Sequence, residues 1–170
     1  MSKGTDTEKN KETAPGKLCF SGVPVPEAIV KFIRRHHVMT VATALPGEVP
    51  WCANVFYSYM PQENLFVFTS EDKTRHAGEM EQAGEIGASI VLETKNVGLV
   101  QGLQIQGRVD RPSGEGLRRA KASYLKRFPY AAVVELSLWT MKPANMKLTD
   151  NRLGFGKKLY WEKDGGGQQE

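Results

Sequence analysis

The sequence is poor in cysteine: Cys19 and Cys52 are the only two among its 170 residues, and they lie far apart without the spacing of a metal site. This usage argues against a disulfide framework and predicts a reduced, cytoplasmic protein. The chain also lacks an apolar run of signal-peptide length at its start, and it lacks any segment long enough to cross a bilayer. We therefore expect no membrane association.

Several catalytic signatures are missing as well. No P-loop, GxSxG or HExxH pattern occurs in the sequence. The three histidines, His36, His37 and His76, have no carboxylate or cysteine at ligand spacing, so we expect no metal site. Cys52 would need a neighbouring base to act as a nucleophile, and a half-buried strand cysteine is the favoured interpretation.

The residues that are present suit a single soluble domain, with 40% hydrophobic and 25% charged residues. The net charge of +4 comes from scattered basic residues, which permits an anionic ligand without favouring nucleic acid. The basic segment 117–127 is read as a solvated helix face. Residues 1 to about 17 are almost free of large apolar side chains, and 163–170 have a similar composition. We predict disordered tails over 1–22 and 163–170, around one domain of residues 23–162.

Hydrophobic periodicity predicts a mainly β protein with peripheral helices. Helices are expected from Pro26 to about His37, over 73–82, and from a cap at Ser113 to the residue before Pro129. Strands are expected at 38–45, 51–60, 65–70, 86–93, 99–111, 135–143, 145–151 and 157–162. This order favours a closed or partly closed β-barrel, with bends or bulges at Gly102 and Gly107.

A basic cluster follows the strand that ends near Thr69. Lys73, Thr74, Arg75 and His76 are consecutive at the start of the second helix. Cations at a helix N-terminus oppose its dipole, at a cost of roughly a few tenths of a kcal/mol each. A bound phosphate would offset that cost, because hydroxyls, charges and free backbone N–H groups converge there. A solvated, mildly strained helix start remains the alternative.

Three segments carry a family resemblance: "MTVATALPGEVPWCANVFY" (39–57), "LFVFTSEDKTRHA" (65–77) and "LQIQGRVDR" (103–111). In order and spacing they resemble the flavin-binding core of the pyridoxamine phosphate oxidase-like split-barrel superfamily. Over residues 26–161, including "TDNRLGFGKKLYW", the chain resembles the YhbP-like branch of that superfamily.

The resemblance implies a six-stranded antiparallel split β-barrel that forms a homodimer, with flavin mononucleotide (FMN) at the subunit interface. Thr69 matches the strand-end threonine that lies near the FMN phosphate. Lys73 stands where the oxidases have serine, and Arg75 where they have lysine. On the second strand, the backbone of Asn54, Val55 and Phe56 would run beside the isoalloxazine ring.

Departures from the oxidase pattern restrict the implied activity. Ala53, Ser58 and Gly102 stand where the oxidases have arginine, lysine and a flavin-contacting glutamine, although Gln104 could replace that glutamine. The C-terminal substrate-binding pattern of the oxidases is absent, so pyridoxamine phosphate oxidation is not expected. Trp139 and Lys157 are predicted to complete the cleft from the partner subunit, with a core tryptophan and a solvated lysine as the alternative.

Two functional hypotheses follow. The first is an FMN-binding flavoprotein, acting as an oxidoreductase on an unidentified substrate with NADH or NADPH as the hypothetical electron donor; no side chain stands out as a catalytic acid or base. The second is a non-catalytic dimeric binding module that holds another anionic ligand, or haem through a histidine.

Overall fold

The structure is a computed structural model, and it describes residues 11–12, 17–21, 24–153 and 157–163. Its helices are α1 (Glu27–Arg35), α2 (Arg75–Ala83) and α3 (Gly114–Arg127), with short 3-10 turns η1 (Val97–Leu99), η2 (Pro129–Val133) and η3 (Asn151–Leu153). Its strands are β1 (Lys11–Glu12), β2 (Lys17–Ser21), β3 (Val38–Thr43), β4 (Trp51–Met60), β5 (Leu65–Thr69), β6 (Glu85–Val91), β7 (Gln101–Asp110), β8 (Leu138–Asp150) and β9 (Lys158–Glu162).

Six of these strands close into an antiparallel barrel. They are hydrogen-bonded in the order β8-β5-β4-β3-β6-β7, and β7 pairs back onto β8. Because side chains alternate along each strand, every second residue points into the barrel core. The largest side chains fully buried there include Met39, Tyr57, Phe66, Trp139 and Met141. The predicted six-stranded antiparallel barrel with peripheral helices is confirmed.

The long strand β8 differs from the sequence-based expectation of two strands, 135–143 and 145–151. It continues through Pro143 because a bulge absorbs one residue: Gln106 of β7 pairs with Asn145, whereas Gly107 pairs with Pro143. A Cβ atom on Gly107 would lie 2.7 Å from the carbonyl oxygen of Lys142, so only glycine fits this close approach. The bulge predicted at Gly107 is thus confirmed, and it explains why the two expected strands are one.

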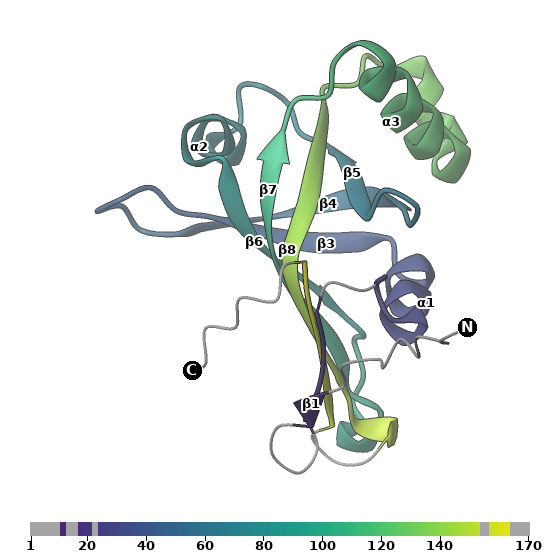
Figure 1. Ribbon diagram of the computed structural model, residues 1–170. Coiled ribbons are helices and arrows are strands. Elements are labelled where there is room, and N and C mark those ends of the chain that lie inside the picture. Colours follow the sequence, from purple (N-terminus) through teal and green to yellow (C-terminus); the bar gives the residue numbers. More distant parts are fainter. Residues whose placement is uncertain (1–10, 13–16, 22–23, 154–156, 164–170) are drawn as a thin grey trace, which may run out of the picture.

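The helices cover the barrel unevenly (Figure 1). Helix α1 inserts Ile29, Phe32 and Ile33 into the barrel core next to the start of β3. Helix α2 lies near the other end of β3, where Thr43 donates a hydrogen bond to Glu79. Helix α3 packs against β4, β5 and β8 from outside and forms a second hydrophobic cluster with them.

The C-terminal half of β8 continues past the end of its pairing with β5 and pairs with β9, which in turn pairs with β2 in parallel. The sequence predicts disorder over residues 1–22, and the structure differs from this prediction at Lys11–Glu12 and Lys17–Ser21, which form β1 and β2. The physical reason is that the edge of β9 offers unpaired backbone groups that β2 can bind. Residues 164–170 lie outside the described residues, so the predicted C-terminal tail beyond residue 163 stays a prediction.

None of the helices in the described ranges is both long enough and apolar enough to cross a membrane.

Candidate functional site

The start of α2 carries a compact polar network. Thr74 caps the helix, since its hydroxyl accepts from the backbone N–H of Ala77 at 3.4 Å and donates to the carbonyl of Glu71 at 2.8 Å. The buried hydroxyl of Ser70 lies 2.7 Å from Nε2 of His76 and 3.0 Å from the Thr74 hydroxyl. Burial lowers the pKa of His76, although Glu79 opposes that shift, so the imidazole is neutral at neutral pH.

Arg75 ties this helix start to the β3–β4 hairpin. Its Nε lies 2.5 Å from the carboxylate of Glu79, its Nη2 donates to the carbonyl of Val49 at 2.9 Å, and its guanidinium lies 5.0 Å from the ring centroid of Trp51. The hydrogen bonds from Thr43 and Arg75 lower the pKa of Glu79, which keeps this buried residue ionised.

The ion pair between Arg75 and Glu79 explains in part how the start of α2 tolerates a cation. Glu79 stands four residues after Arg75 on the same helix face, and such a pair offsets the cost of a cation at the helix start. The Arg75 side chain nevertheless remains 45% exposed, and Lys73 is exposed in the preceding turn. Lys73, Thr74 and Arg75, the residues predicted to bind phosphate, therefore all lie at the start of α2, and Arg75 forms an ion pair with Glu79.

The predicted ring-side residues lie on an open face of the barrel. Asn54 and Phe56 point outward and are exposed, whereas Val55 is 7% exposed and points into the core, so that only its backbone could touch a ligand. Strand register places Asn54 opposite Thr40, Thr40 opposite Ser89, and Ser89 opposite Gln104. We call these four residues the polar row. The Thr40 hydroxyl donates to the side-chain oxygen of Asn54 at 2.7 Å.

Small side chains lie beside the polar row. Cys52 pairs with Ala42, and Ala42 pairs with Gly87, on the same outward face. Cys52 is a free, exposed cysteine on β4, which agrees with the expected strand position and leaves it more exposed than predicted. The outward face of β3, β4 and β6 therefore carries amide and hydroxyl groups next to a patch of small side chains.

The remaining predicted residues lie apart from this face. Thr69 ends β5 with its hydroxyl 3.4 Å from that of Tyr124 on α3. Trp139 is 1% exposed because its position on β8 points into the barrel, with the Arg111 guanidinium 4.0 Å from its ring centroid. This placement agrees with the alternative of a core tryptophan. Lys157 is exposed and borders residues 154–156, which the structure does not describe.

The departures from the oxidase pattern have structural counterparts. Ser58, where the oxidases have lysine, is 2% exposed and lies 3.0 Å from the hydroxyl of Ser123 on α3. Ala53, where they have arginine, packs partly buried against the barrel core. Neither position can offer a charged contact to a ligand.

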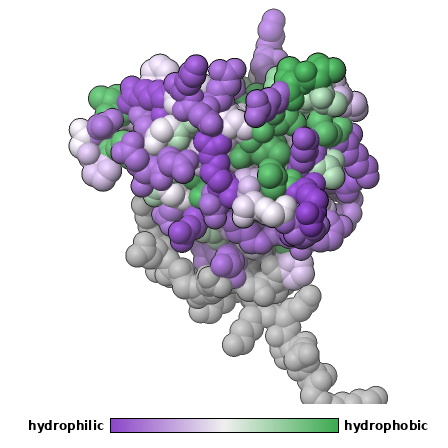
Figure 2. Space-filling model, turned by 90° about the horizontal axis from the view of Figure 1, so that it is seen from above, coloured by the Kyte–Doolittle hydropathy of each residue, from purple (hydrophilic) through white to green (hydrophobic). Residues whose placement is uncertain are grey.

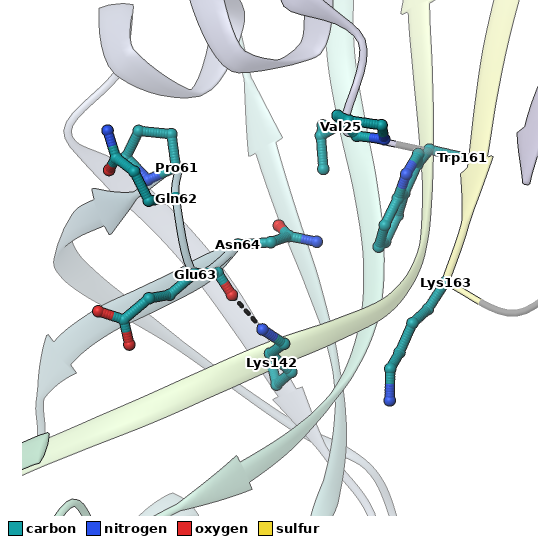
Figure 3. A pocket seen from close by; sticks show the side chains of 9 residues that line it. Val25, Pro61, Gln62, Glu63, Asn64, Lys142, Trp161 and Lys163 are labelled. Atoms are coloured by element: carbon teal, nitrogen blue, oxygen red, sulfur yellow. Dashed lines mark hydrogen bonds between the residues drawn. The ribbon is translucent and has the colours of Figure 1, made fainter. Parts of the chain in front are cut away.

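A separate cavity of about 330 Å³ lies near the β4–β5 turn (Figure 3). Its lining includes Asn64, Trp161 and the lysines Lys142 and Lys163. The Lys142 ammonium donates to the carbonyl of Glu63. None of the residues predicted for FMN lines this cavity, so it does not belong to the predicted flavin site.

Sequence reasoning missed an aromatic cluster around Phe128, next to Phe56. The Phe128 ring centroid lies 5.5 Å from that of Phe56, 6.1 Å from that of Tyr130 and 6.3 Å from that of His37. Val133 of η2 is 88% exposed nearby in the chain. Hydrophobic residues gather over one side of the face shown in Figure 2. The adjacent aromatic and valine residues of "RFPYAAVV" (127–134) were the available signal.

The histidines do not come together as a metal site. His36 and His37 follow α1, whereas His76 lies on α2 near the other end of β3. Within the described ranges, no group of three or more His, Cys, Asp or Glu residues is placed to hold a metal ion.

The closed six-stranded antiparallel barrel is the fold of pyridoxamine phosphate oxidase-like split-barrel proteins. Solved structures of this kind resemble it. A haem-binding protein of Mycobacterium smegmatis matches with a TM-score of 0.67 and 19% identity over 83% of this chain and 60% of that chain. An FAD-binding protein of Mesorhizobium loti matches with a TM-score of 0.58 and 13% identity over 73% and 93% of the two chains. At these identities the likeness establishes the fold alone.

The sequence relatives identify the family. A UPF0306 protein of Klebsiella pneumoniae is 38% identical over 142 residues, which cover 84% of this chain and 96% of the relative. The UPF0306 protein YhbP of Escherichia coli is 36% identical over the same shares. The chain belongs to the UPF0306 family. No protein-family model matches the sequence.

Proposed function

We propose that the protein binds FMN in a cleft between two subunits, with the phosphate at the start of α2 and the ring along β4. The observation that carries this proposal is the contact between Arg75 and Trp51, at 5.0 Å. Trp51 begins β4, and Asn54 of the polar row follows three residues later, about 10 Å along the strand. The side chain of Trp51 projects to the opposite face of β4 from Asn54, so it is the strand itself that runs from the start of α2 to the open face, where Cys52 and Asn54 lie.

The residues present fit the two parts of FMN. At the phosphate end, Lys73 and the partly exposed Arg75 supply charge, and the α2 dipole favours an anion. At the ring end, the amides of Asn54 and Gln104 supply donors and acceptors, and Phe56 supplies an apolar surface. Bound FMN would supply hydride-transfer chemistry, while these residues bind and orient it.

A second subunit would complete this arrangement. The polar row is bordered by exposed apolar side chains, with Val38, Phe56 and Val91 exposed by 43, 49 and 65%. Burial of such residues against an identical face suits a homodimer of standard interface size, on the order of 1,600 Å² in total. The dimer would exclude water from the ring. We propose on this basis an FMN-dependent oxidoreductase reduced by NADH or NADPH.

The proposal is tested by FMN titration of the Lys73→Ala/Arg75→Ala double variant. Loss of two charge-assisted contacts should weaken FMN binding by about 2–4 kcal/mol, since such contacts are worth about 1.5–3 kcal/mol each and are not additive. The matched control is Arg118→Ala/Lys121→Ala, which removes two exposed cations from α3. Equal FMN affinity in the double variant and the wild type would reject the phosphate site.

A haem-binding module is the second candidate. It is favoured by His37, an exposed imidazole beside the ring of Phe128, which also contacts Phe56. The similarity in fold to a haem-binding protein of M. smegmatis is compatible with it.

A further inference from the structure

The cavity of about 330 Å³ near the β4–β5 turn is enclosed by segments that are distant in the sequence (Figure 3). The turn itself, residues 61–64, forms one wall. Residues 24–25, which precede α1, Lys142 of β8, and the end of β9 with Trp161 and Lys163 form the others. Its volume is within the range of small-molecule sites. The cavity is therefore a product of the tertiary structure and not of a single loop.

Asn64 places an oriented amide at this cavity. It is the one non-glycine residue with a positive φ, 46°, among the described residues, and asparagine tolerates this left-handed region better than most side chains do. Its Oδ1 accepts a hydrogen bond from the Tyr59 hydroxyl at 2.8 Å, which fixes the orientation of the amide. The Nδ2 group then lies on the side of Trp161 in the view of Figure 3, so the amide offers a donor to a ligand.

Two lysines bring positive charge to the same cavity. Lys142 lies at the bulge, where its carbonyl oxygen would be 2.7 Å from a Cβ atom on Gly107, and bulges of this kind redirect side chains. Its ammonium donates to the carbonyl of Glu63, which leaves its other N–H groups for a ligand. Lys163, which follows β9, is exposed and lines the cavity as well.

No carboxylate cancels this charge among the described lining residues. Glu63 is the one acid among them, and its carboxylate points away from the cavity (Figure 3) and pairs with Arg119 at 3.2 Å. The rest of the lining is apolar. Trp161 offers a flat ring, and Val25 and Pro61 add aliphatic surface. The cavity thus combines a cationic, hydrogen-bonding side with an apolar side.

We propose that this cavity binds a small organic carboxylate with a flat apolar body. The carboxylate accepts hydrogen bonds from Asn64, Lys142 and Lys163, and the apolar body lies against Trp161. A carboxylate is an acceptor with two oxygens, and its hydrogen bonds to ammonium groups are stronger than neutral ones. At roughly 30 Å³ of liquid volume per water molecule, the cavity has room for on the order of ten non-hydrogen atoms. The inference depends on neither the FMN site nor the haem-binding candidate.

The test is an NMR titration of the ¹⁵N-labelled full chain with benzoate as the probe. In the wild type, the Nδ2 signals of Asn64 and the indole N–H signal of Trp161 should shift saturably, while the indole signals of Trp51 and Trp139 stay in place. Benzamide, which has nearly the same shape without the charge, should bind at least roughly tenfold more weakly. Inorganic phosphate, which has the charge without the apolar body, should also bind more weakly than benzoate.

Variants separate the contributions of the lining residues. Lys142→Gln/Lys163→Gln should weaken benzoate binding by roughly tenfold or more, because it removes two charge-assisted hydrogen bonds. Lys121→Gln, at an exposed position of α3, is the control and should keep the wild-type affinity. Asn64→Gly removes the amide and keeps the left-handed backbone accessible, so it should weaken binding without unfolding the turn. Thermal unfolding of each variant checks that it is folded.

Three results would overturn the proposal. Benzoate that produces no saturable shift at Asn64 and Trp161 in the wild type rejects the site. Equal affinities for benzoate and benzamide, or an unchanged affinity in the double lysine variant, reject recognition of the carboxylate. Equal affinities for benzoate and phosphate reject the role of the apolar wall. FMN titration of the double lysine variant, expected to match the wild type, distinguishes each of these results from failure of the flavin proposal.

Discussion

The two halves of the barrel's outer surface differ in the way they are used. Under α3, outward residues of the strands are apolar and buried: Val67 and Leu138 join Tyr124 and Phe128 in one cluster. On the open side, Thr40 of β3, Ser89 of β6 and Gln104 of β7 join Asn54 of β4 in the polar row, bordered by the exposed Val38 and Val91. These residues all point away from the barrel interior, so the difference between the two halves does not come from packing of the core. The covered half stabilises the fold, and the open half is available for binding.

The largest effect is expected where the covered half is opened. Leu138→Ala removes a side chain that is 4% exposed beneath α3 and should lower the free energy of unfolding by about 2–5 kcal/mol. Val38→Ala, at a 43% exposed position of the open half, should change it by about 0.5 kcal/mol or less. Urea denaturation measures the free energy of unfolding of both variants. Equal decreases in the two variants would contradict the claim that only the covered half stabilises the fold.

Two barrel glycines give a sharper comparison. In Gly107→Ala the new Cβ would collide with the backbone carbonyl of Lys142, so unfolding free energy should fall by about 1–3 kcal/mol. In Gly87→Ala the nearest atom, the Cβ of Ala42, would lie 3.9 Å away, which is an ordinary contact, so stability should hold. Thermal unfolding of the two variants measures these changes in stability. A Gly107→Ala protein as stable as the wild type would contradict the close approach of Gly107 to Lys142.

How far the sequence predicts these features depends on the range of the interaction. Strand β4 has the predicted bounds of 51–60, because alternation and aromatic residues are local signals. Gly107 predicts a bulge locally, but the continuity of β8 through Pro143 depends on which strand lies opposite that glycine. The burial of Ser58 depends on Ser123, 65 residues away on α3. Such pairings between distant segments have no local signature.

The candidate site was predictable to a similar degree. The residues at the start of α2 adjoin one another in the sequence, and the structure keeps Lys73, Thr74 and Arg75 together. Gln104 was expected to stand in for a flavin contact, and strand register does place it in one row with Asn54. The polar partners of Arg75, namely Glu79 and Val49, and the ring packing around Phe128 needed the folded chain.

The polar row should matter for ligand binding and not for stability. Gln104→Ala should leave unfolding free energy within about 0.5 kcal/mol of the wild type, because the side chain is exposed. It should weaken FMN binding by about 0.5–1.5 kcal/mol, the net value of one hydrogen bond. Gln82→Ala, on an exposed face of α2, is the control. Flavin fluorescence titration measures the FMN affinity of both variants. Equal FMN affinities for Gln104→Ala and Gln82→Ala would exclude Gln104 from the FMN site.

The smallest expected effect is a pH dependence at Glu79. Its pKa in the folded protein lies below the ordinary value of 4.5, so it stabilises the fold above that pH, and this contribution is lost as the pH falls through the folded pKa. Glu79→Gln should therefore show a shallower loss of melting temperature on acidification. The remaining loss belongs to other carboxylates, such as Asp150, whose pKa is lowered by Arg152. An unchanged acid slope would show that the pair with Arg75 adds no stability.

The measurement that tests the central claim most directly is size-exclusion chromatography of the wild type with added FMN, read by light scattering and in-line visible absorbance. If the open half of the barrel forms a shared flavin cleft, the protein elutes at twice the mass of the 18.9 kDa chain and carries one flavin per subunit. A peak at the mass of one chain, with all the flavin eluting separately, would contradict the account.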